Sequence, residues 1–234
     1  MKMVREVQFD DGFSSPSDEC GCDSVFQIFP RFHADNRGHF VEVIRNSWGH
    51  WIRDFSWMKQ VNRSSSRSCV LRGCHAQRGA MCQGKLVEAV NRTIYDIITD
   101  ARPNSGSFGV TSVYRLDPEV HNQLWIPRGF LHAFAVPNSE TTEPEAIFQY
   151  YVDNAYDKTS EICINPKSFL VPLMTCHRSM CKNMECSDFD ALHELFAREE
   201  RLIISDKDLS GVDYNRFMTS VKLEYETSGR LWYR

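Results

Sequence analysis

Short β-type segments dominate residues 25–166 and constrain the fold more than any other feature of the sequence. Runs of five to eight residues rich in Val, Ile, Phe, Tyr and Thr are separated by turn residues. They are VFQIFPRF (25–32), HFVEVIR (39–45), KLVEAV (85–90), TIYDIITD (93–100), VTSVYRL (110–116), NQLWIP (122–127), HAFAV (132–136) and AIFQYYV (146–152). So many strands with so few helices predict an all-β sandwich, jelly roll or barrel.

The segments between these runs predict one hairpin and two helices. Asn91 and Arg92 separate two strands, which is the length of a two-residue hairpin loop. Apolar residues at helical spacing predict one packed helix in 46–56 and another in 190–201. The buried positions are Trp48, Trp51, Ile52 and Phe55 in the first helix and Leu192, Leu195 and Phe196 in the second.

Composition shifts along the chain predict three parts. Residues 1–24 are polar and rich in Ser and Asp, and are expected to form an N-terminal arm. Residues 25–166 carry the β-core. Residues 167–234 form a C-terminal extension that holds an insertion and the second helix.

Charge and hydropathy exclude several classes of protein. The formal net charge is −4, whereas nucleic-acid binders usually carry a basic face. No apolar run approaches the roughly 18 residues that span a bilayer, and 1–19 lack the apolar stretch of a secretory signal. We therefore expect a cytoplasmic protein without nucleic-acid or membrane partners. The nine cysteines, Cys176, Cys181 and Cys186 among them, are then expected to be free thiols.

Polar residues gather in four strand-like segments: HADNRGHFVEV (33–43), CVLRGCHAQRGAMCQGKLVEAV (69–90), QLWIPRGFLHAF (123–134) and IFQYYV (147–152). The run from Pro127 to His132 matches the P-x-G-x-x-H half of the cupin pattern. Where the other half has His-x-His, this chain has His75, Ala76 and Gln77. Two histidines are too few for a typical metal site without added carboxylates, so we predict a barrel without a metal or other cofactor.

Four motifs together resemble the dTDP-4-dehydrorhamnose 3,5-epimerase family. They are RFHADNRGHF (31–40), VLRGCHAQRGAMCQGKLVEAV (70–90), QLWIPRGFLHAF (123–134) and ISDKD (204–208), in the family's order. The resemblance implies a cupin jelly roll (a double-stranded β-helix barrel) with a few peripheral helices. It also implies a metal-free homodimer that exchanges N-terminal strands, for which 25–32 is a candidate. The implied activity is epimerisation at C3 and C5 of a nucleoside-diphosphate 4-keto-6-deoxyhexose for deoxysugar biosynthesis.

The resemblance also implies roles for individual residues. A keto group acidifies its neighbouring C–H bonds, so the reaction needs a base, an acid on the other face and a cation near the enolate oxygen. His75 resembles the base, Asp208 its partner, Lys85 the cation and Tyr150 the acid. Counting from Asp153 instead selects Gln149 for the acid position.

The substrate contacts implied by the resemblance lie on several segments. Arg37 and Arg72 resemble ligands of the diphosphate and sugar, since arginine binds phosphate through two parallel bonds. The remaining expected contacts to nucleotide and sugar are Phe40, Glu42, Gln60, Asn62 and His132.

The sequence also departs from the family. Cys74 and Ala76 are smaller than the usual residues beside the base, Val61 replaces an acidic residue, and 167–200 are longer. These differences leave open an epimerase acting at C3 alone or C5 alone, or on another sugar nucleotide. Two further alternatives are a metal-dependent cupin isomerase or dioxygenase, with a third ligand near His75 and His132, and a non-catalytic sugar-nucleotide-binding module.

Overall fold

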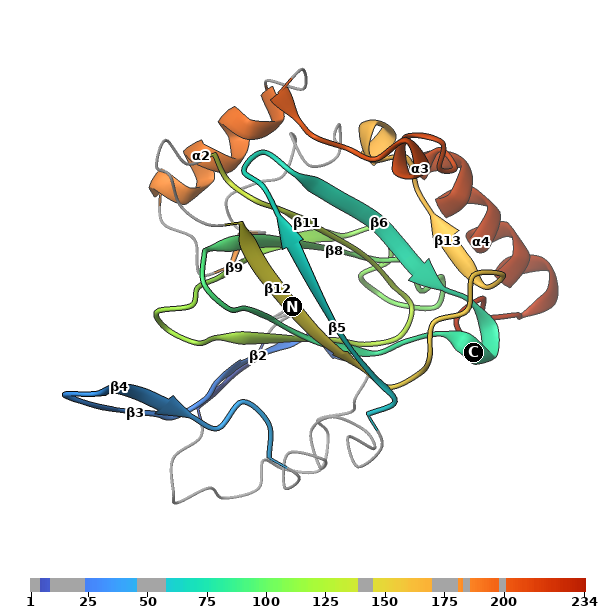
Figure 1. Ribbon diagram of the computed structural model, residues 1–234. Helices are drawn as coiled ribbons and strands as arrows, with labels where there is room; N and C mark the ends of the chain where they lie inside the picture. The colour runs from blue at the N-terminus through green and yellow to red at the C-terminus, as the bar shows by residue number, and fades with distance from the viewer. Residues whose placement is uncertain are drawn as a thin grey trace.

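Two six-stranded β-sheets, packed face to face, form the body of the protein (Figure 1). The computed structural model describes residues 5–8, 24–45, 58–138, 145–169, 181–182, 186–197 and 201–234. The first sheet has the order β1-β2-β10-β7-β12-β5 and the second β13-β6-β11-β8-β9-β14, while β3 and β4 pair only with each other. The strands of the first sheet are β1 (Arg5–Gln8), β2 (Phe26–Phe29), β10 (Gln123–Ile126), β7 (Lys85–Ala89), β12 (Ala146–Val152) and β5 (Gln60–Ser66). Those of the second are β13 (Glu161–Cys163), β6 (Leu71–Gln77), β11 (Phe130–Ala135), β8 (Ile94–Asp100), β9 (Thr111–Leu116) and β14 (Cys181–Lys182).

The predicted all-β jelly roll is confirmed, and strands form within each of the eight apolar runs. Two of these runs contribute to β3 (Phe32–Asp35) and β4 (Gly38–Val41), which make a separate exposed hairpin. The eight runs do not include β5, whose sequence QVNRSSS carries a single aliphatic residue, or β6, which lies in the polar segment 69–90. Within the described residues 5–8 of the proposed N-terminal arm, β1 lies parallel to β2.

The predicted hairpin at Asn91 is wrong. The strand before it, β7, pairs with β10 and β12 in the first sheet, whereas β8 pairs with β11 and β9 in the second. Asn91 instead bonds to the start of β12 and the residue before it, accepting from the Ile147 N–H and donating to the Glu145 carbonyl. The side chain thus anchors a crossing between the sheets.

The main core lies between the sheets. Leu124 and Phe148 of the first sheet share one apolar cluster with Ile98 and Tyr114 of the second. All seven residues of β8 are buried, because the outer face of the second sheet is covered as well.

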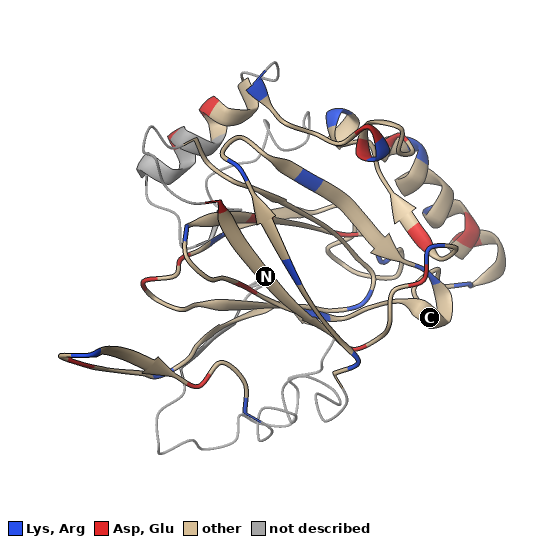
Figure 2. Ribbon diagram, in the orientation of Figure 1, with Lys and Arg blue, Asp and Glu red and all other residues tan. Residues whose placement is uncertain are grey.

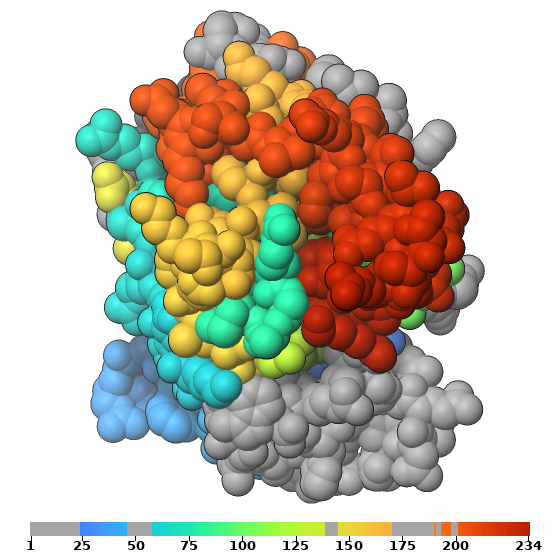
Figure 3. Space-filling view, turned by 90° about the vertical axis from the view of Figure 1, so that its right-hand side faces the viewer, coloured from blue at the N-terminus to red at the C-terminus, as the bar shows by residue number. Residues whose placement is uncertain are grey.

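Helices of the C-terminal region cover that outer face: α2 (Cys186–Ala197), α3 (Asp206–Leu209) and α4 (Tyr214–Ser228). Buried residues of α2 and α4, including Leu195, Phe196 and Phe217, join the cluster formed by the second sheet. Figure 3 looks at the right-hand side of Figure 1, and the C-terminal residues, in orange and red, cover much of that side. α2 begins earlier than the predicted helix, while the helix expected in 46–56 lies outside the described residues. No described helix meets the length and hydropathy of a membrane span.

A β-bulge in β6 sets which side chains face the space between the sheets. His132 of β11 pairs with His75 and Phe134 pairs with Arg72, so two steps on β11 match three on β6. Strict alternation would place Arg72 and His75 on opposite faces, because they are three residues apart. The bulge turns both toward the same pocket. Gly73, inside the bulge, has φ +104°.

Gly73 also lies against β11. A Cβ atom at this position would be 2.6 Å from the His132 carbonyl oxygen and 2.8 Å from the Ala133 Cα. Both contacts are with backbone, so no side chain can move aside. The close approach therefore fixes β6 to its neighbour at the level of His75.

We expect Gly73→Ala to destabilise the protein more than Gly109→Ala does, as measured by urea unfolding. Gly109 has φ +81° and open space around a Cβ, so alanine there adds only left-handed strain, about 1–2 kcal/mol. At Gly73 the collision with β11 adds about 1–3 kcal/mol more. Equal losses of unfolding free energy in the two variants would show that the close approach does not matter.

Candidate active site

A cavity of about 430 Å³ lies between the sheets, where β5 and β12 face β6 and β11. Its lining is mostly polar, although the surrounding core is apolar. The lining residues are Gln60, Asn62, Ser64, Arg72, His75, Ala76, Gln77, Gln83, Lys85, His132, Ala133, Phe134, Phe148, Tyr150, Tyr156, Glu161 and Lys207. Seven of the eleven residues predicted from the sequence are therefore brought together here.

Asp208 stands behind His75 and completes a bonded pair. His75 Nε2 lies 2.7 Å from Asp208 Oδ1, and the Gly73 N–H lies 3.4 Å from Asp208 Oδ2. Ser205 caps α3 by accepting from the Asp208 N–H at 3.1 Å, which fixes the start of this helix. The carboxyl group is thus held by β6 and α3 together.

This pairing determines how the imidazole presents itself to the pocket. Burial raises the pKa of Asp208, but the bond to His75 and the charge of His75 outweigh that effect, and the pKa lies below its usual value. An ionised carboxylate can only accept hydrogen bonds, so Nε2 carries the proton and donates it in a hydrogen bond when His75 is neutral. The lone pair is then on Nδ1, the nitrogen that a base would use.

Half-buried Lys85 and buried His132 line the floor of the pocket, and the buried carboxylate of Asp96 lies next to His132. His132 Nε2 lies 2.6 Å from Asp96 Oδ1, and both side chains are buried. The other carboxylate oxygen, Oδ2, has no hydrogen-bond partner within the described residues. Burial lowers the pKa of Lys85 and of His132, and the negative charge of Asp96 opposes both shifts. This floor can stabilise a developing negative charge.

The two residues competing for the acid position face opposite ways. Tyr150 lines the pocket, and burial raises the pKa of its hydroxyl despite the opposing charge of Arg72. Gln149 lies on the outer face of the sheet, where it bonds to Arg63 and to Glu88 Oε1. Tyr151 also donates to Glu88 on that face. The phenol available to the pocket from β12 is therefore that of Tyr150.

The polar wall of the pocket is held by hydrogen bonds among its own residues and to the neighbouring residues of β5. Gln60 donates to Asn62 Oδ1 at 2.6 Å and accepts from the Tyr156 N–H at 3.0 Å. Arg72 donates to Ser66 Oγ at 2.9 Å and to the Ser65 carbonyl at 3.1 Å. Figure 2 shows basic residues on β5 and β6. Arg72 of β6 lines the pocket, whereas Arg63 of β5 bonds to Gln149 outside it.

Three predicted substrate ligands do not line this pocket. Arg37 and Phe40 lie on the β3–β4 hairpin, which projects away from the body in Figure 1. Arg37 bonds to Asp35, and Phe40 is 65% exposed. Glu42 follows the hairpin and pairs with Arg45. Residues 26–29, within the candidate exchange strand 25–32, pair with β10 of the same chain.

Sequence reasoning missed several residues of the pocket and its surroundings. Asp96 had a visible signal, since it is the charged residue inside the apolar run TIYDIITD. Glu161 bonds to Lys207 at 2.7 Å and to the Tyr156 hydroxyl at 3.0 Å, a contact between three segments that no local pattern indicates. Of the two small residues that the sequence places beside the base, Cys74 and Ala76, both belong to one apolar cluster and Ala76 also lines the pocket.

One metal-capable group lies beside the base. The ligand atoms of His75, Cys163 and Asp208 are all within 4.8 Å of one another. Burial, together with the charge of Asp208, raises the pKa of the Cys163 thiol to about 11. Like Cys69, Cys74 and Cys82, it is free of disulfides, and the side chains of the other five cysteines lie outside the described residues.

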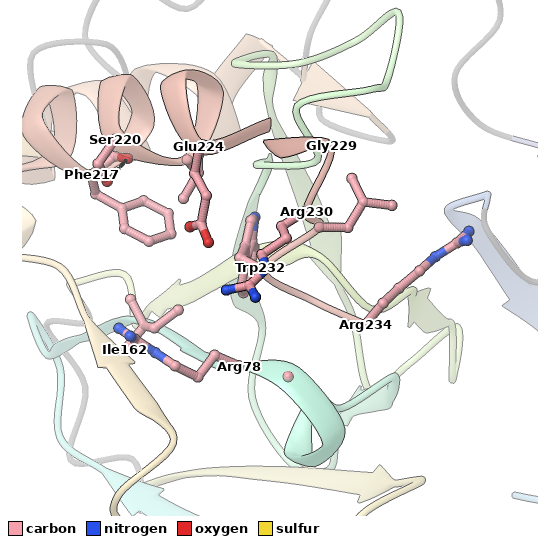
Figure 4. A pocket seen from close by; sticks show the side chains of 12 residues that line it. Arg78, Ile162, Phe217, Ser220, Glu224, Gly229, Arg230, Trp232 and Arg234 are labelled. Atoms are coloured by element: carbon pink, nitrogen blue, oxygen red, sulfur yellow. Dashed lines mark hydrogen bonds between the residues drawn. The ribbon is translucent and has the colours of Figure 1, made fainter. Parts of the chain in front are cut away.

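A second cavity, of about 610 Å³, lies between α4 and the C-terminal residues. Its apolar floor includes Phe217 and Trp232, and Arg78 and Arg230 stand at its edge. Figure 4 shows Glu224 directed from α4 toward Trp232 and Arg230. It shares no lining residue with the first cavity.

Comparison with known proteins identifies the family. A family model described as dTDP-4-dehydrorhamnose 3,5-epimerase matches residues 19–213. The chain is 38% identical over 152 residues to the dTDP-4-dehydrorhamnose 3,5-epimerase of Escherichia coli (strain K12), covering 64% of this chain and 80% of that protein.

Solved structures of related epimerases are similar to this structure. The dTDP-4-dehydrorhamnose 3,5-epimerase of Elizabethkingia anophelis NUHP1 has a TM-score of 0.62 at 27% identity, covering 87% of this chain and 96% of that one. A dTDP-6-deoxy-D-glucose-3,5-epimerase of Legionella pneumophila Philadelphia 1, solved with dTDP-4-keto-L-rhamnose, has a TM-score of 0.60 at 27% identity, covering 81% and 87%. This chain therefore belongs to the dTDP-4-dehydrorhamnose 3,5-epimerase family, a family of isomerases built on the cupin barrel.

Proposed function

We propose that the chain epimerises a nucleoside-diphosphate 4-keto-6-deoxyhexose of the dTDP-4-dehydro-6-deoxyglucose type, at C3, at C5 or at both, for deoxysugar biosynthesis. The observation that carries the proposal is the placement of His75, bonded to Asp208, in one pocket with Lys85 and Tyr150. Binding a sugar nucleotide needs neither a base nor an acid, so this set favours catalysis over a binding module. The four described cysteines carry no disulfide, which suits the expected reducing cytoplasm.

The proposed reaction moves protons through an enolate. His75 Nδ1 takes the proton from the carbon beside the keto group, and the C–H electrons form the C–C double bond of an enolate. Asp208 stabilises the resulting imidazolium, and Lys85 stabilises the enolate oxygen. Tyr150 then donates its hydroxyl proton to the opposite face of the same carbon, which inverts it. Solvent returns the Tyr150 proton and removes the one on His75.

We favour proton transfer as the chemistry of the pocket, and we treat the metal-capable group of His75, Cys163 and Asp208 separately below. Each pocket histidine has a ring nitrogen bonded to a carboxylate, His75 to Asp208 and His132 to Asp96. Such pairs orient imidazoles for proton transfer and hydrogen bonding.

A second copy of the chain completes the proposed site. The β3–β4 hairpin exposes every residue except Val41 and contributes nothing to the lining of its own pocket. Arg37 and Phe40 offer a phosphate ligand and a base-stacking face on this projecting arm. We place them in the pocket of the partner in a homodimer, where they would bind the nucleotide and diphosphate.

We expect deuterium from D₂O to enter dTDP-4-dehydro-6-deoxyglucose at C3, C5 or both during turnover, as read by NMR. His75→Asn should lower turnover and exchange by roughly 10²–10⁴, because the base is lost. The matched control is His193→Asn, at an exposed helical position. If the wild type exchanges neither carbon with dTDP, UDP, GDP or CDP sugars, the proposed activity is wrong.

Tyr150→Phe should separate exchange from inversion. The base still removes and returns its proton on one face, so deuterium enters the substrate while formation of the epimer falls by roughly 10²-fold or more. Tyr151→Phe removes a hydroxyl on the other face of β12 and serves as the control. A Tyr150→Phe enzyme that inverts its substrate at the wild-type rate would rule out this acid.

Mixing two inactive variants tests the shared site. Arg37→Ala and His75→Asn chains, denatured together and refolded, should regain about a quarter of the wild-type rate, because mixed dimers then hold one intact site. The single variants refolded alone are the controls. No recovery in mixtures shown to contain mixed dimers would place Arg37 in the site of its own chain.

A further inference from the structure

We propose that His75, Cys163 and Asp208 form a binding site for Zn²⁺ that switches off the base. Cys163 lies directly opposite His75 in the β13–β6 pairing. Its Sγ atom is 3.7 Å from Asp208 Oδ1, the same oxygen that lies 2.7 Å from His75 Nε2. The three ligand atoms thus converge on one point from β6, β13 and α3.

The donor set fits zinc. Thiolate, imidazole and carboxylate are the ligands zinc uses, and three protein ligands with one open position are common. The bond lengths of a tetrahedral zinc site separate its ligand atoms by roughly 3.3–3.6 Å. The Sγ–Oδ1 distance is already close to this range, and the Nε2–Oδ1 distance needs to open by about 0.6 Å, which a small side-chain rotation provides. The sulfur disfavours Mg²⁺ and Ca²⁺, which prefer oxygen ligands.

The site is within reach of an ion from solvent. Cys163 and His75 are both half-buried, and only Asp208 is buried. Cys163 does not line the catalytic pocket and is assigned no step in the reaction. A metal can therefore reach the cluster while the residues that would bind the sugar stay in place.

Zinc bound at this position displaces protons from His75 and Cys163, and His75 can then no longer act as a base. Zn²⁺ takes the place of the proton on His75 Nε2, and through exchange with solvent the imidazole takes up one proton on Nδ1 in its place. The thiol proton of Cys163 passes to solvent as the thiolate binds. A neutral imidazole bound through Nε2 carries its proton on Nδ1. The nitrogen that would accept the substrate proton then has no lone pair, and Asp208 no longer pairs with it.

The test compares Cys163→Ser with Cys69→Ser, which alters another half-buried thiol. The first readout is the absorption spectrum of the protein titrated with Co²⁺, which replaces Zn²⁺ and gives a thiolate charge-transfer band when sulfur binds. We expect that band in the wild type and in Cys69→Ser, and its loss or marked weakening in Cys163→Ser. This readout does not depend on the proposed activity.

The second readout is turnover, with each variant compared with its own rate in EDTA. We expect micromolar Zn²⁺ to inhibit the wild type and Cys69→Ser reversibly, and Mg²⁺ to have no such effect. Cys163→Ser should need on the order of tenfold more Zn²⁺. The chain has nine cysteines, any of which could bind a metal. The conclusion therefore depends on the difference between Cys163→Ser and Cys69→Ser. Equal Co²⁺ spectra and equal Zn²⁺ inhibition in the two variants would overturn the proposal.

Discussion

The β-bulge at Gly73 is the constraint on which the rest of the site depends. Without the extra residue in β6, Arg72 and His75 would face opposite sides of the sheet, and the pocket would lose one of them. The same stretch gives its Gly73 N–H to Asp208, so the irregular backbone also holds the partner of the base. Glycine is required because β11 passes so close that no Cβ atom fits. One local departure from regular pairing therefore sets the lining, the base and the contact with the C-terminal region.

The carboxylate of Asp208 transmits this arrangement to the C-terminal region. α3 holds Asp208 against β6, while β13 brings Cys163 alongside and the Lys207–Glu161 pair closes the adjoining wall. Asp96 plays a comparable part for His132 on the pocket floor, near Lys85. Buried carboxylates tend to be paired because an isolated charge is costly to bury, and here each partner is a histidine of the pocket. The two histidine–carboxylate pairs therefore both join neighbouring elements of the jelly roll and set the charges around the pocket.

The sequence predicted most of the strands, and it indicated residues that the structure gathers around one pocket, because both leave local signals. Alternating apolar runs mark the strands. His75, Lys85 and Asp208 stand in recognisable motifs, while Tyr150 lies in the polar strand-like segment 147–152. The errors arose where long-range contacts decide. β5 is too polar to be read as a strand, and Asn91 bonds across to residues 145 and 147 instead of turning a hairpin. No local pattern reveals that Cys163 lies opposite His75, or that Arg37 and Phe40 project away from the pocket of their own chain.

The central claim is that a keto-sugar ring lies between His75 and Tyr150, with Lys85 at its keto oxygen. The most direct measurement is a crystal structure of the protein with a bound dTDP-4-keto-6-deoxysugar or an unreactive analogue. The account predicts the carbon beside the keto group within about 3–3.5 Å of His75 Nδ1, with the Tyr150 hydroxyl on the other face of the ring. A sugar bound with His75 and Tyr150 on the same face, or outside the pocket between the sheets, would contradict it.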